Sequence, residues 1–234
     1  MNTTSRTSSI AHRIRRYAAA GSLLAFPALL VVEAVLDPAP GGTGEVMFTA
    51  ASDHAGALLA SAVLLMLSGI LMVPAVGGLL HRARNRGAGL ANLAAVLGVL
   101  GGFGHFAIGM FYLVALALPG GDQNAMIAYI ERLNATPALG AIAFPLILCF
   151  GLGVVAMAWA AWRTGLIGWW GPIGVTAVVV LHEVMPTSIP SIDIAALGVL
   201  TVVFGYLGVR IATLSDTEWG PVPQARAAFA PATV

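Results

Sequence analysis

Four ionisable side chains lie inside long apolar stretches of the sequence, where such residues are costly, rare and usually functional. They are Glu33, His105, His182 and Glu183. Three further ionisable residues stand at the starts of apolar stretches: Asp53, His54 and Asp193. An imidazole can ligate a metal or transfer a proton, and a carboxylate can carry a proton or bind a cation. These residues are therefore our candidates for ligand binding or proton transfer.

His105 carries the clearest local pattern. It shares a helical face with four glycines and a tyrosine: Gly98, Gly101, Gly102, Gly109 and Tyr112. Glycine stripes let membrane helices approach closely, so His105 is expected to point into a helix–helix interface, with Tyr112 as a further candidate on that face. The pattern fits a ligand or proton-transfer group. It fits equally a structural imidazole bonded to a backbone carbonyl.

His105 and His182 form a second pattern, because each lies nineteen residues after an arginine, Arg86 or Arg163. Two imidazoles facing each other across a bundle can be the axial ligands of haem b. This layout resembles the four-helix core of cytochrome b561-type proteins, which have six spans and histidines on the third and fifth helices. The resemblance implies haem ligation by His105 and His182. It departs from the family because a second histidine pair is missing.

A divalent metal is the other cofactor option. His54, His105 and His182 with the nearby carboxylates offer the mixed nitrogen and oxygen ligands that zinc accepts. The spacing of these residues matches no tight metal-binding motif. Neither haem nor metal is therefore fixed by the sequence, and whether the chain is an enzyme stays open.

The elements that position these residues are predicted to be membrane-spanning helices. Hydrophobic residues make up 59% of the chain and charged residues 9%, against about 25% charge in soluble domains. A helix needs about 20 apolar residues to cross a bilayer. Six stretches meet that length: 17–36, 55–80, 90–118, 138–162, 166–185 and 192–214. The predicted fold class is an all-α polytopic membrane bundle, with the second to fifth helices as a possible four-helix core.

The arginines predict the orientation. The chain has 11 basic residues, all arginine, and six spans place every one except Arg132 on the same side. The positive-inside rule makes that side cytoplasmic, with both termini inside. We expect a transmembrane domain at 17–214 between disordered cytoplasmic tails at 1–16 and 215–234. The connection 120–137 is predicted to hold a short amphipathic outer helix.

The first stretch has a rival interpretation as a cleaved signal peptide, because it has a basic start and an apolar middle. Its apolar run is longer than usual for such a peptide, and no convincing small-x-small cleavage site follows it. These features favour a retained helix.

Composition narrows the function classes. A net charge of +1 offers no basic surface for nucleic acid. The single Cys149 allows no intrachain disulfide. The arginine, alanine and glycine bias suggests a bacterial plasma-membrane protein in the lipid bilayer. Our leading hypothesis is an outward-opening polar pocket that binds or moves a small or lipid-like molecule in transport, export or immunity. The alternatives are a haem or metal enzyme or redox protein, and a scaffold subunit of a homo- or hetero-oligomer.

Overall fold

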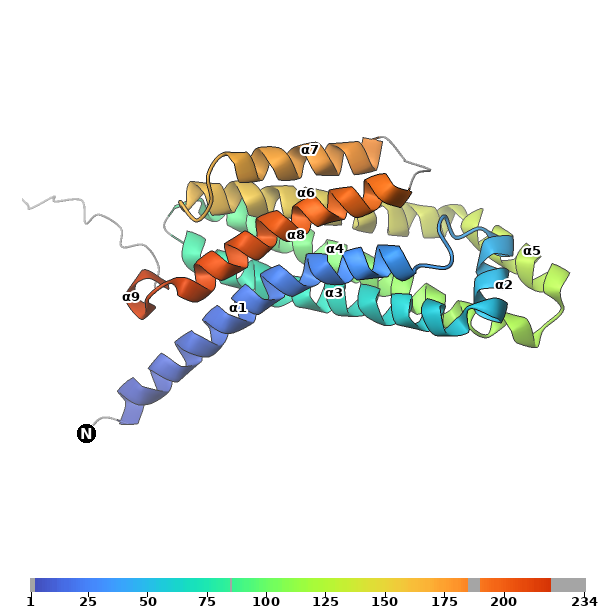
Figure 1. The fold of residues 1–234 in the computed structure, drawn as a ribbon, viewed down its shortest axis with the longest axis horizontal. Helices are drawn as coiled ribbons and strands as arrows, with labels where there is room; N and C mark the ends of the chain where they lie inside the picture. The colour runs from blue at the N-terminus through green and yellow to red at the C-terminus, as the bar shows by residue number, and fades with distance from the viewer. Residues whose placement is uncertain (1–2, 85, 185–189, 220–234) are drawn as a thin grey trace, which may run out of the picture.

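The computed structural model describes residues 3–84, 86–184 and 190–219, with side chains at 10–84, 86–181 and 192–219. Within these ranges every regular element is a helix. Six long helices run along the molecule, together with shorter ones at its two ends (Figure 1). The long helices are α1 (Thr3–Leu36), α3 (Ala55–Ala83), α4 (Ala88–Ala115), α6 (Pro137–Arg163), α7 (Trp170–Val184) and α8 (Pro190–Thr213). The short ones are α2 (Gly44–Asp53), η1 (Leu118–Gly120), α5 (Gln123–Asn134) and α9 (Asp216–Trp219).

The long helices form a closed ring. Each packs against two neighbours in the order α8, α1, α3, α4, α6, α7 and back to α8. The packing of α1 against α3 and α8, and of α4 against α3 and α6, is extensive, whereas α7 packs sparsely on α6 and α8. The expected core of the second to fifth long helices is therefore not the main packing unit. α1 is a full member of the ring and buries Leu23 and Phe26.

Five helices in the described part of the chain are long and apolar enough to cross a membrane: Ile10–Leu36, Ala55–Ala83, Ala88–Gly120, Pro137–Arg163 and Ile192–Thr213. The expected fifth span is shorter than predicted, because α7 begins at Trp170 and not at Leu166. Pro172 explains this start, since proline is tolerated in the first turn of a helix but disrupts a helix interior. The structure thus supports a multi-pass membrane architecture, with α7 as a shorter apolar helix.

A glycine cap ends α6 and turns the chain toward α7. Gly165 has a φ of 76°, a left-handed conformation that glycine adopts without steric cost. The Leu166 N–H donates to the Ala161 carbonyl at 3.0 Å, and the Gly165 N–H donates to Trp162 at 2.9 Å. This is the Schellman pattern. It makes α6 and α7 antiparallel neighbours, as the tight turn in the sequence predicts (Figure 1).

The first half of α1 contacts the segment after α8 at one end of the bundle. The Arg16 guanidinium lies 3.0 Å from Asp216 and also donates to the Leu214 carbonyl. Arg13 lies 3.3 Å from the same carboxylate, and the Trp219 ring packs on His81 at 5.1 Å. Within the expected tails, α1 already begins at Thr3, and α9 covers 216–219. Residues 220–234 lie outside the described part.

Hydrogen bonds between Ser215 and Glu218 stabilise the start of α9. The Ser215 backbone N–H and hydroxyl donate to Glu218 Oε2 at 2.9 and 2.7 Å. These hydrogen bonds hold the pKa of Glu218 below its ordinary value, and the bond from the Ser215 hydroxyl has the larger effect. They favour the ionised carboxylate, which serves as the acceptor in the first turn of α9.

The opposite end of the bundle carries α2 and α5, which pack against each other (Figure 1). The Gly44 N–H donates to Glu131 Oε1 at 2.6 Å, and Asn134 donates to the Gly42 carbonyl at 3.0 Å. Asp122 caps α5 by accepting from the Ala125 N–H at 2.9 Å. The amphipathic helix predicted in 120–137 is thus present as α5, with Ile130 fully buried.

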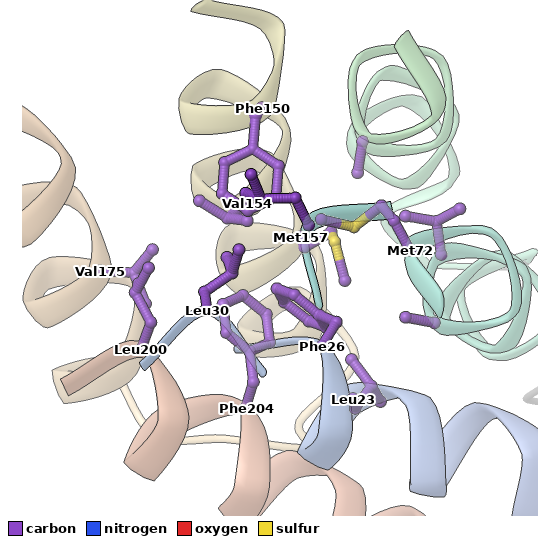
Figure 2. Packing of buried hydrophobic residues seen from close by; sticks show 14 of the residues in the cluster. Leu23, Phe26, Leu30, Met72, Phe150, Val154, Met157, Val175, Leu200 and Phe204 are labelled. Carbon is purple, nitrogen blue, oxygen red and sulfur yellow. The ribbon is translucent and has the colours of Figure 1, made fainter. Parts of the chain in front are cut away.

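Apolar side chains fill the bundle between its two ends. Phe26 of α1 lies 5.3 Å from Phe204 of α8 and 6.4 Å from Phe150 of α6, measured between ring centroids. Figure 2 shows these rings turned toward one another, with Met72 and Met157 beside them. Phe26, Phe204, Met72 and Met157 are all fully buried. We call this cluster of Phe26, Phe150, Phe204, Met72 and Met157 the apolar plug, because it fills the middle of the ring.

Candidate functional site

A cavity of about 870 Å³ lies inside the helix ring, on the side of the apolar plug away from the chain ends. Residues of α1, α3, α4, α6, α7 and α8 line it. Most of the described wall is aliphatic, and four of the described lining residues are ionisable: Glu33, Asp37, His105 and Asp193. An apolar cavity of this size with a few convergent polar groups is the usual form of a small-molecule site.

The end of α1 supplies the first two carboxylates. Glu33 and Asp37 are half-buried and lie one helical turn apart, so both face the same cavity. The helix stops at Leu36, two residues before Pro38, which would disrupt a continuing helix. The chain then turns across the cavity, and Pro40 and Gly41 join the wall.

Asp37 is held in place by two hydrogen bonds. The Ala39 N–H donates to its Oδ1 at 2.9 Å, and the Tyr112 hydroxyl donates to its Oδ2 at 3.2 Å. Tyr112 is 8% exposed and belongs to α4, so its hydrogen bond joins the turn after α1 to α4. Asp37 is not among the candidates predicted from the sequence. The signal that could have found it is an acid one turn after Glu33 on the same helical face.

His105 enters the cavity from α4. Its Nδ1 lies 3.2 Å from the Gly101 carbonyl, one turn earlier, so Nδ1 is the donor in the neutral ring. The Phe150 ring packs against the imidazole at 4.0 Å. The prediction that His105 points into a helix interface is in keeping with this placement. The bond to the Gly101 carbonyl matches the structural interpretation of His105. Its position in the cavity wall matches the ligand-binding interpretation.

Asp193 enters from the first turn of α8 and is half-buried in the cavity wall. Residues Glu33, His105 and Asp193 thus come from three different helices and meet at one cavity. No sequence spacing connects them. The ring topology alone brings them together.

The structure does not bring every candidate to this site. Asp53 and His54 are exposed at the junction of α2 and α3, outside the cavity wall. Tyr112 acts on the site through Asp37 and does not line the wall. His182 and Glu183 belong to α7, but their side chains lie outside the described residues.

A haem or metal site stays a prediction for the same reason. Among the described residues, no group of three histidine, cysteine or acidic side chains lies close enough to hold a metal ion. Nδ1 of His105 is bonded to the Gly101 carbonyl. The opposing ligand would be His182, whose side chain is not described. We therefore derive no chemistry through either cofactor.

Comparisons with protein-family models, with curated proteins and with solved structures find no match to this chain. The cavity and its lining residues are therefore the basis for the function proposed below.

Proposed function

We propose that this chain is a bacterial plasma-membrane protein that binds, and in transport or export moves, a small or lipid-like molecule in the cavity of its helix ring. The observation that carries the proposal is the meeting of Glu33, His105 and Asp193 from three helices at one largely apolar cavity of about 870 Å³. Polar groups placed in such a wall orient a ligand, while the aliphatic surface supplies its binding energy.

The proposal includes six membrane crossings with both termini in the cytoplasm. The contacts of Arg13 and Arg16 with Asp216 support it, because they put the start of α1 and the end of α8 at the same end of the bundle. The other arginines at this end, including Arg82, Arg84 and Arg163, follow the positive-inside rule. A span of 15 residues in α7 is about 22 Å long. The apolar segment before Trp170 would extend that crossing toward the arginine end.

The position of the plug supports outward access. Phe26, Phe150 and Phe204 close the ring between the cavity and the arginine end. In the proposed orientation a ligand therefore reaches the cavity from outside the cell or from the outer leaflet. An immunity role would need only this binding step. Transport or export would also need a helix to move, and the sparsely packed α7 is the member of the ring best suited to that.

Blocking the cavity tests the proposal. Ala196 lines the cavity, whereas its neighbour Ala195 is exposed on the outside of α8. We expect Ala196→Trp to reduce retained ligand at least about tenfold, and Ala195→Trp to leave it unchanged. Purified protein exposed to a bacterial total lipid extract would be examined by native mass spectrometry for bound molecules.

The pair of variants has a clear contrary outcome. If Ala196→Trp and Ala195→Trp carry the same adducts as the unsubstituted protein, the molecules are bound at the lipid-facing surface and not in the cavity. That result would favour the scaffold role, in which the buried polar groups only fix helix packing.

A further inference from the structure

The ionisable groups in the described cavity wall are mainly acidic. Among the described residues that line it, three are carboxylic acids, Glu33, Asp37 and Asp193, one is the histidine His105, and none is an arginine. The chain contains no lysine at all. The arginines Arg13 and Arg16 form ion pairs at the opposite end of the bundle. Among the described lining residues the acids therefore outnumber the one imidazole, and no guanidinium or ammonium group lines the cavity with them.

The acids are arranged around one end of the cavity. Glu33 belongs to the last turn of α1 and Asp37 directly follows that helix, whereas Asp193 belongs to the first turn of α8, which packs along α1. Both oxygens of Asp37 accept hydrogen bonds, from Ala39 and from Tyr112. These two donors keep the carboxylate oriented.

The rest of the wall is apolar. Phe150, Val154, Val178, Leu197 and Leu200 extend from the acidic end toward the plug. Figure 2 shows Phe150 above Leu30 and Phe26, and Leu200 beside Val175. This surface would bury hydrocarbon or aromatic groups, with Phe150 offering a ring face to a nearby cation.

From these two features we infer that the cavity selects an amphipathic organic cation, with its charge at Glu33, Asp37 and Asp193 and its apolar part against Phe150 and Leu200. This inference rests on the proposed function and adds the chemical class of the ligand. A buried charge is costly unless an opposite charge compensates it. The cavity meets that need for a cation and repels an anion of the same shape.

A pair of probe ions of matched shape and opposite charge tests the inference. Tetraphenylphosphonium is a cation, and tetraphenylborate is an anion of closely similar size. We expect the purified protein to bind the phosphonium at least about tenfold more tightly than the borate, measured by equilibrium dialysis against matched empty detergent micelles. Ala196→Trp should abolish this binding, and Ala195→Trp should not.

Acid substitutions locate the charge that is responsible. Glu33→Gln and Asp193→Asn should each raise the dissociation constant of the phosphonium by about tenfold. Asp53→Asn is the matched control, because Asp53 is an exposed acid outside the cavity wall. It should change the constant less than twofold. Size-exclusion profiles and unfolding midpoints identify any variant that is misfolded, and the comparison of the two ions needs no variant.

The outcomes separate this inference from the proposed function. Equal or tighter borate binding that Ala196→Trp removes would overturn the cation inference and keep the cavity as a ligand site. The same holds if neither ion binds but Ala196→Trp still removes a lipid adduct. If no probe and no adduct responds to Ala196→Trp, both proposals fall.

Discussion

Replacing Gly102 with alanine is expected to lower the free energy of unfolding by about 1–3 kcal/mol. A Cβ atom on Gly102 of α4 would lie 2.7 Å from the backbone carbonyl oxygen of Gly69 on α3, closer than real Cβ contacts allow. Backbone cannot rotate away as a side chain can, so α3 and α4 would have to separate. In a membrane the association of helices depends largely on such close packing, because lipid is as apolar as the protein interior. The measurement is a titration with sodium dodecyl sulfate in mixed micelles, followed by circular dichroism.

Gly77→Ala is the matched control for this effect. Gly77 is also in the interior of α3, but a Cβ atom there would have nothing within 4 Å. Alanine should therefore be neutral or stabilise the helix slightly, by up to about 1 kcal/mol. The difference between the two variants isolates the helix–helix contact from the intrinsic preference of alanine for helices. Equal unfolding midpoints for the two would show that α3 and α4 do not pack through Gly69 and Gly102.

Arg16→Gln is expected to cost about 2 kcal/mol of stability. The Arg16 side chain is 8% exposed and bonds both Asp216 and the Leu214 carbonyl, so it joins α1 to the end of α8. Glutamine loses the charge and is too short to reach both partners. The unfolding titration described above measures the loss.

Arg13→Gln is the comparison for Arg16. Arg13 contacts the same Asp216 carboxylate, but its side chain is 61% exposed. Exposed ion pairs contribute little, so we expect a loss below about 0.5 kcal/mol. Asp216→Asn combined with each arginine variant completes a double-mutant cycle. If both arginine variants were equally stable, Arg16 would not be the residue that fixes the two chain ends together.

The helices could be predicted from the sequence to the extent that apolar length alone defines them. The stretches 55–80, 90–118 and 138–162 correspond to α3, α4 and α6 within a few residues. The prediction failed for the start of α7, where residues 166–169 are apolar but not helical. It also gave no helix at α2. That short helix has Met47, Ala50 and Ala51 on one buried face, a spacing too brief to stand out against the long apolar stretches.

The site could be predicted only in part. Glu33, His105 and Asp193 are recognisable because an ionisable residue in an apolar stretch is unusual. Their meeting at one cavity depends on α8 packing along α1, a contact between the two ends of the chain that no local pattern encodes. Asp53 and His54 have similar local signals, yet α2 directs them away from the cavity. Local sequence thus identified the residue types, and helix packing selected among them.

Labelling of single cysteines tests the outward-facing cavity most directly. In a Cys149→Ala background, Ala196→Cys places a thiol in the cavity wall, and Thr213→Cys places one at the arginine end of α8. A membrane-impermeant maleimide applied to intact cells should label the cysteine at 196 and should reach the one at 213 only after permeabilisation. Labelling at 213 in intact cells, with protection at 196, would contradict the account.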